Sequence, residues 1–110
     1  MILCLGIPMK VSYYCSGVSP YTLWNAYYTD GITMSIDTSQ CNFSSTPLYF
    51  TSLAGTSYHY MVGGYTAIYS PTKNSFKIFA TSWSAAFPYT VLLDYSDTRQ
   101  WDVNWFGILE

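Results

Sequence analysis

The stretch that most constrains the fold is residues 46–78, where short apolar segments alternate with clusters of Gly, Pro, Asn and Ser. The apolar segments have the length of strands and are rich in aromatic and β-branched residues, which favour extended backbone. Such segments, separated by turn-forming residues, are typical of an antiparallel β-protein. The three predicted strands are residues 46–53, 65–69 and 75–81, and the two predicted turns are residues 54–57 and 70–74.

Two segments outside this stretch alternate between apolar and polar residues. Ile32, Met34 and Ile36 alternate with polar residues, which predicts a strand buried on one face. Residues 101–108 begin with the same alternation and then change register, so we predict a β-bulge near Trp105. Shorter strands are predicted at residues 10–14 and 89–93, and loops at residues 16–20, 29–31, 37–40 and 83–88.

No segment keeps a 3.6-residue period, so we expect little or no helix. Six or seven short strands in 110 residues predict an all-β fold, a single antiparallel β-sandwich. We expect this domain at residues 21–110, preceded by an N-terminal segment, residues 1–20, that adds a strand or serves as an assembly arm. Residues 1–8 are apolar but lack the basic start and the length of a signal peptide. An added strand is the simpler interpretation, and a remnant of a longer parent is the alternative.

The composition excludes several classes of protein. Charged residues make up 9 % of the chain, against about 25 % in an ordinary soluble domain. Half of the residues are apolar, which excludes disorder, and no apolar run is long enough to span a membrane. The net charge is −2 and the four basic residues are scattered, so nucleic acid is not an expected partner. The weakly charged surface indicates a self-associating protein at an extracellular, cell-surface or virion-surface location.

The three cysteines are Cys4, Cys15 and Cys41. An odd number leaves at least one thiol unpaired or bound to another chain. If one disulfide forms, Cys15–Cys41 is the pair that we expect, because both residues flank the first strands. The alternative is that all three are small buried side chains in a reducing compartment. Zinc is not expected, because the chain has no CxxC spacing and a single histidine, and no other cofactor is indicated.

Catalytic machinery is not evident in the sequence. His59 is interpreted either as a ligand-contacting residue on a loop or as a half-buried residue bonded to a backbone carbonyl. A hydrolase would need a pocket that joins His59 to a serine or a carboxylate, and the chain has no GxSxG motif. The aspartates lie in turns or alternate with core residues; Asp37 is expected to accept a backbone amide in an Asx-turn. We therefore expect no enzymatic activity.

Tyrosine is the unusual residue of this chain, which has twelve. Tyr and Trp offer a flat apolar face with a polar edge, which suits stacking on sugar rings and also subunit interfaces. We expect strand propensity alone to explain more than half of the twelve. The candidates for exposed recognition are Tyr58, Tyr60 and Tyr65, beside glycine-rich loops, followed by Trp24, Tyr27 and Tyr28. A sequon at Asn42 predicts N-glycosylation if the chain passes through a eukaryotic secretory pathway.

Several aromatic motifs together resemble the H-type lectin family. They are Pro47 with Phe50, Tyr65-Thr66-Ala67-Ile68-Tyr69, Ser75-Phe76-Lys77-Ile78-Phe79 through Trp83, and Trp101-Asp102-Val103-Asn104-Trp105-Phe106-Gly107-Ile108. The resemblance covers residues 24–110. It implies a sandwich of about six strands that forms trimers and binds N-acetylgalactosamine-type sugars at clefts between subunits. The chain departs from the family pattern in one respect: it lacks the clear cluster of polar and charged sugar-contact residues before the last strand. Residues 94–100 are the nearest counterpart of that cluster.

The sequence thus favours a carbohydrate-binding, lectin-like recognition or adhesion module that acts as an oligomer, with glycans as partners. The alternative is a structural subunit that assembles into a fibre or filament. The predicted ligand-binding residues are Tyr58, His59, Tyr60, Tyr65, Asp94, Asp97 and Arg99.

Overall fold

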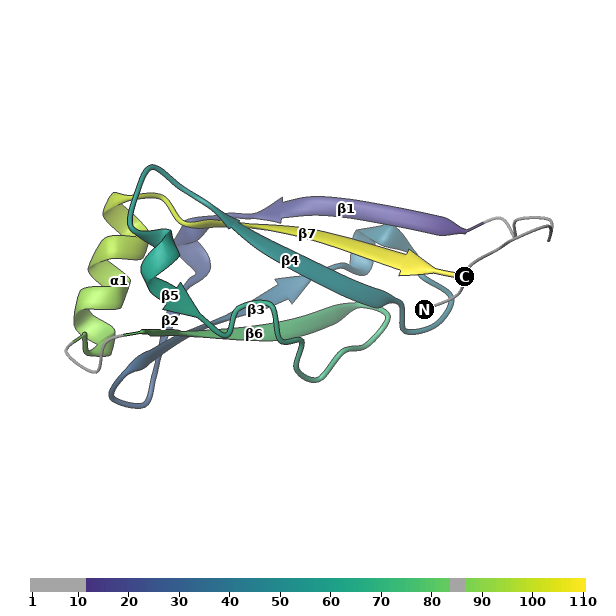
Figure 1. Ribbon diagram of the computed structural model, residues 1–110. Helices are drawn as coiled ribbons and strands as arrows, with labels where there is room; N and C mark the ends of the chain where they lie inside the picture. Colours follow the sequence, from purple (N-terminus) through teal and green to yellow (C-terminus); the bar gives the residue numbers. More distant parts are fainter. Residues whose placement is uncertain (1–11, 84–86) are drawn as a thin grey trace, which may run out of the picture.

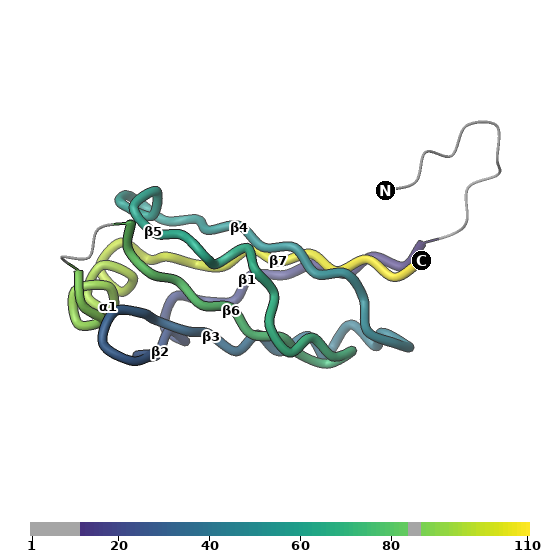
Figure 2. The backbone as a smooth tube through the Cα atoms, turned by 60° about the horizontal axis from the view of Figure 1, so that its bottom comes forward, coloured from purple at the N-terminus to yellow at the C-terminus, as the bar shows by residue number. Residues whose placement is uncertain are grey.

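The computed structural model describes residues 12–83 and 87–110 and consists of two antiparallel sheets with one short helix (Figure 1). The molecule is elongated, with extents of 51 × 28 × 24 Å. The helix α1 lies at one end and the C-terminus of the last strand at the other (Figures 1 and 2). The prediction of an all-β sandwich is confirmed.

The first sheet has three strands and the second has four. In the first sheet the order is β1 (Tyr13–Ser19), β7 (Asp102–Leu109), β4 (Leu48–Ala54). In the second sheet the order is β2 (Asn25–Tyr27), β3 (Gly31–Asp37), β6 (Ser75–Ser82), β5 (Val62–Gly63). The helix α1 spans Tyr89–Thr98, and short 3₁₀ turns lie at Tyr21–Leu23, Ser39–Cys41 and His59–Met61.

The core lies between the inward faces of the two sheets. On β3 the predicted alternation is confirmed, since Ile32, Met34 and Ile36 are all buried. Register brings Met34 opposite Ile78 of β6, so neighbouring strands bury a continuous apolar surface. From the first sheet and the other elements, the core receives Tyr49, Leu92, Trp101 and Val103 among others. Trp24, a candidate for exposed recognition, belongs to this core as well.

The disulfide Cys15–Cys41 is present and ties β1 to the 3₁₀ turn at Ser39–Cys41, with 5.8 Å between the two Cα atoms. This is the pair that the sequence favoured. Cys4 and residues 1–8 lie outside the described residues, so the proposed roles of the N-terminal segment stay predictions. Residues 13–19 of that segment form β1, an edge strand of the first sheet.

The strand predicted at residues 89–93 is wrong, because this segment begins the helix α1. Pro88 precedes the helix, and its carbonyl accepts hydrogen bonds from the amides of Val91 and Leu92. At the other end, Gln100 adopts a left-handed φ of 53°, while the amide of Trp101 bonds to the carbonyl of Ser96 at 2.9 Å. This is a Schellman ending, in which glycine usually occupies the left-handed position.

Three other local predictions are also wrong. Residues 16–20 were expected to form a loop, but most of them belong to β1, where Gly17 packs on the indole of Trp105. Residues 65–69 form turns instead of a strand, and only Tyr69 makes an isolated bridge, to Lys77. The bulge near Trp105 is absent, because β7 keeps one unbroken register with both β1 and β4.

Candidate functional site

Two of the predicted ligand-binding residues, Tyr58 and Arg99, meet at the end of α1. Loop residues 55–58 lie against this end, because the amide of Thr56 donates to the carbonyl of Arg99 at 2.9 Å. The indole Nε1 of Trp101 donates to the carbonyl of Ser57, also at 2.9 Å. Gly55 permits this close approach, since a Cβ there would lie 2.9 Å from the carbonyl oxygen of Arg99. The loop is thereby fixed to the helix.

The guanidinium of Arg99 lies over two tyrosine rings. Its central carbon is 4.5 Å from the ring centroid of Tyr58 and 4.4 Å from that of Tyr95. The two rings stack with centroids 5.4 Å apart. Sequence reasoning missed Tyr95 because it treated this segment as non-helical; on a helix, Tyr95 and Arg99 stand four residues apart and share a face. We call Tyr58, Tyr95 and Arg99 the arginine–tyrosine cluster.

In the described residues, no side-chain hydrogen bond, ion pair or ring contact joins the side chains of the remaining predicted site residues to this cluster. Tyr60 is 78 % exposed, and Asp94 and Asp97 are exposed on α1. The Nδ1 atom of His59 is buried without a hydrogen-bond partner among the described residues. Tyr65 is partly buried, and its carbonyl accepts a hydrogen bond from Thr51 of β4. Among the other candidates, the side chains of Tyr27 and Tyr28 contact each other, with ring centroids 4.4 Å apart.

A cleft of about 470 Å³ lies between β1 and β3, and none of the seven predicted ligand-binding residues lines it. It exists because β2 is short and pairs only with Gly31–Thr33, which leaves the second half of β3 without a neighbour on that side. The strand facing it, β1, is the edge of the first sheet. Its volume falls in the range of about 300–1,000 Å³ that is usual for small-molecule sites.

The cleft combines one aromatic side chain with several polar ones. Trp105 contributes its indole, which Gly17 accommodates, since a Cβ at that position would lie 2.7 Å from the ring. Ser35 and Gln40 also line the cleft, and their side chains have no hydrogen-bond partner among the described residues, nor has the indole Nε1 of Trp105. These groups are therefore available to a ligand.

Asp37 adds a carboxylate to this cleft. The predicted Asx-turn is confirmed, because the amide of Ser39 donates to Oδ1 of Asp37 at 2.9 Å. This hydrogen bond stabilises the ionised form and holds the pKa of the Asp37 carboxyl below its ordinary value. The ionised carboxylate is thus a hydrogen-bond acceptor at the edge of the cleft at neutral pH. Nothing in the local sequence identifies the cleft, because it depends on how far β2 pairs with β3.

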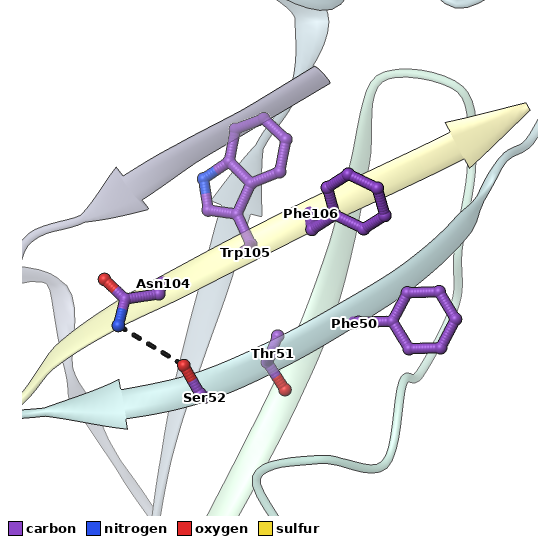
Figure 3. Close-up of a pocket in the computed structure, with 6 residues that line it drawn as sticks. All are labelled: Phe50, Thr51, Ser52, Asn104, Trp105 and Phe106. Carbon is purple, nitrogen blue, oxygen red and sulfur yellow. Dashed lines mark hydrogen bonds between the residues drawn. The ribbon is translucent and has the colours of Figure 1, made fainter. Parts of the chain in front are cut away.

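The outer face of the first sheet is apolar and exposed. Register aligns Phe50 of β4 with Phe106 of β7 and Ser16 of β1. A shallow hollow of about 230 Å³ lies beside the two phenylalanines and the hydrogen bond between Asn104 and Ser52 (Figure 3). Among the outward positions of these strands the one charged residue is Asp102, at the start of β7, where its carboxylate accepts a hydrogen bond from the amide of Tyr21. The other outward positions are Tyr14, Ser16, Val18, Leu48, Phe50, Ser52, Ala54, Asn104, Phe106 and Ile108.

The described residues contain neither a cluster of metal-ligating side chains nor a membrane-spanning helix. In residues 12–83 and 87–110, no group of three His, Cys, Asp or Glu side chains is placed to hold a metal ion. The one helix in these ranges is too short to cross a membrane. Asn42 is exposed and adopts a left-handed φ of 56°, so the sequon is accessible.

No protein-family model matches this chain, and a search of curated proteins finds no match. The resemblance to the H-type lectins therefore stays a prediction.

Proposed function

We propose that this protein is a non-catalytic carbohydrate-recognition module and that it binds sugar in the cleft between β1 and β3. The observation that carries the proposal is the combination of a partly exposed indole, at Trp105, with unpaired polar side chains in one cleft. Sugars present the same combination, with apolar C–H faces and hydroxyl edges. The resemblance to the H-type lectins supports the same class of ligand.

The polar groups of the cleft suit a neutral sugar. Ser35 and Gln40 can each donate and accept hydrogen bonds, so they can pair with hydroxyls of either orientation. Asp37 accepts only, and a carboxylate with two oxygens can receive two neighbouring hydroxyls. Its charge also disfavours an anionic ligand here, because like charges repel.

The disulfide supports a proposed location outside the cytoplasm. Cys15 and Cys41 are bonded in the structure, and such bonds persist in oxidising compartments such as the cell exterior. The accessible sequon at Asn42 is consistent with that location. We therefore propose an extracellular, cell-surface or virion-surface module.

A glycan array on the wild type should show saturable binding, and Trp105→Phe should weaken it by about five- to thirtyfold. The smaller ring loses stacking area and the indole N–H, which together are worth about 1–2 kcal/mol. The matched control is Trp83→Phe, because Trp83 is 79 % exposed and lies outside the cleft. A blank array from folded protein would contradict the proposal, and so would equal losses in the two variants.

A second candidate function, self-assembly, is favoured by the outer face of the first sheet. Four of its side chains, Tyr14, Val18, Leu48 and Phe50, are each more than half exposed. The one charge among its outward positions is Asp102, at the start of β7. A second copy of the chain is the proposed occupant, because an apolar face with a single charge at one end is complementary to itself. The face is limited to three strands of seven or eight residues, so we expect its interface to be smaller than the roughly 800 Å² per partner that is standard. We therefore expect concentration-dependent association; the trimer that the resemblance implies stays a prediction.

Phe50→Ser should shift this association to at least about tenfold higher concentration, because it removes an exposed ring worth about 1.5–3 kcal/mol when buried. The control is Tyr60→Ser, which removes an even more exposed ring away from this face. Sedimentation velocity over a range of concentrations measures the effect. A wild type that stays monomeric at the highest soluble concentration would contradict self-assembly and leave sugar binding standing.

A further inference from the structure

The arginine–tyrosine cluster contains a positive charge that the described part of the protein does not neutralise. Arg99 is the only arginine of the chain. Its Nη1 donates to the hydroxyl of Thr98 at 2.8 Å, but it makes no ion pair with a carboxylate of the described residues. Its Nε is buried and has no hydrogen-bond partner among them. A partly buried guanidinium in this condition is unusual, because buried charges are ordinarily paired.

The geometry of the cluster holds this guanidinium ready for a planar partner. The rings of Tyr58 and Tyr95 lie 4.5 and 4.4 Å from its central carbon, which restricts its rotation. A guanidinium has five N–H donors in a fixed plane that matches the two oxygens of a carboxylate. Because the Arg99 side chain is already ordered by the two rings, a carboxylate would bind without the entropic cost of ordering it.

The surroundings limit how tightly an anion binds. Asp94 and Asp97 are exposed on the same helix and repel an anion. Arg99 also follows the C-terminal end of α1, where the helix dipole is negative. An anion therefore needs contacts between its own ring and the protein, in addition to its charge, to bind tightly at Arg99. Tyr58 is 40 % exposed and offers part of its ring to such a contact.

We propose that the arginine–tyrosine cluster is a second binding site, which takes the carboxylate of an acidic sugar such as a uronic or sialic acid. Arg99 binds the carboxylate, and the exposed part of Tyr58 contacts the sugar ring. The site shares no residue with the cleft between β1 and β3, so it does not depend on the function proposed for that cleft.

The test is a titration followed by NMR, because a single arginine gives a single Nε–H signal. Glucuronic acid and N-acetylneuraminic acid should shift this signal saturably. Their methyl esters, which lack the charge, should bind at least about tenfold more weakly. Acetate at the same ionic strength should also bind more weakly than the acidic sugars, since it makes no ring contact.

Two variants separate the site from general electrostatic attraction. Arg99→Lys keeps the charge but loses the planar fork, and affinity for glucuronic acid, read from the ring signals of Tyr95, should fall at least about tenfold. Lys77→Gln removes a charge on the outer side of β6 and should leave the affinity unchanged. Near-ultraviolet circular dichroism establishes that each variant is folded.

Each alternative outcome overturns the proposal. Equal shifts with acid and ester would show that charge is not recognised, and equal affinity for acetate would show that no sugar is recognised. If the Arg99 signal did not shift while the Trp105 indole signal did, the cleft would be the only site for these sugars. Movement of the Arg99 signal with an unchanged Trp105 signal is the expected result, because Asp37 disfavours an anionic ligand in the cleft.

Discussion

Trp101→Ala is expected to lower the free energy of unfolding by about 3–5 kcal/mol, as is usual when a large aromatic side chain is removed from a core. Trp101 is only 1 % exposed and is the largest fully buried side chain. Its removal leaves a cavity at the end of the sandwich where α1 joins β7. The surrounding backbone cannot close this cavity without moving β7, which pairs with both other strands of the first sheet.

The same substitution should also disturb the arginine–tyrosine cluster. The indole Nε1 of Trp101 donates to the carbonyl of Ser57, one residue before Tyr58. Without this bond, residues 55–58 keep the backbone contact of Thr56 to Arg99 as their main attachment to the helix end. Binding of an acidic sugar should therefore weaken more than binding in the cleft.

Chemical denaturation with guanidinium chloride measures the stability loss. The control is Trp83→Ala, because Trp83 is 79 % exposed and its replacement should change the free energy of unfolding by less than about 0.5 kcal/mol. Similar losses in the two variants would contradict the placement of Trp101 in the core.

Removal of the Cys15–Cys41 disulfide, through the double substitution Cys15→Ala and Cys41→Ala, should cost about 3.5 kcal/mol. The bond closes a loop between residues 26 apart in sequence, and the chain-entropy relation gives this value for a loop of that size. Alanine keeps both positions apolar, so the loss reports mainly the cross-link. Both cysteines line the cleft, so sugar binding there should weaken as well.

Thermal or chemical unfolding with and without reductant provides the internal control for the disulfide. Reduction should destabilise the wild type by a similar amount and leave the double variant unchanged. Destabilisation of the double variant by reductant would show that another bond, involving Cys4, contributes instead. A wild type indifferent to reductant would contradict the contribution assigned to Cys15–Cys41.

The sequence predicted those parts of the fold in which the apolar residues of a segment are the ones that pack in the core. The alternation of Ile32, Met34 and Ile36 identified β3 because one face of that strand is buried and the other is not. The segment at residues 75–81, an apolar run that follows a predicted turn, identified β6 within one residue. Both strands are central in their sheet, where burial dictates residue type most strongly.

The helix α1 was missed because its local signals point elsewhere. Its first turn contains Thr90 and Val91, β-branched residues that favour strands, and its N-cap, Pro88, provides no side-chain cap. The ending carries Gln100 where glycine would have marked the left-handed position. Packing of Leu92 into the core stabilises the helix despite these preferences.

The candidate sites were only partly predictable. Tyr58 and Arg99 were chosen from loop context and polarity, and the structure places them together. Tyr95 joins them through helical spacing, which required knowing that α1 is a helix. The cleft around Trp105 arises from the short pairing of β2 with β3, a long-range property that no local pattern of residues encodes.

The central claim, that a sugar binds in the cleft between β1 and β3, is tested most directly through the indole N–H signals of the four tryptophans. The ligand is the neutral glycan that binds most tightly on the array. We predict that the Trp105 signal shifts saturably, while those of Trp24 and Trp101, already hydrogen-bonded to backbone carbonyls, hold their positions. A Trp105 signal that stays fixed when the glycan saturates the protein would contradict the claim.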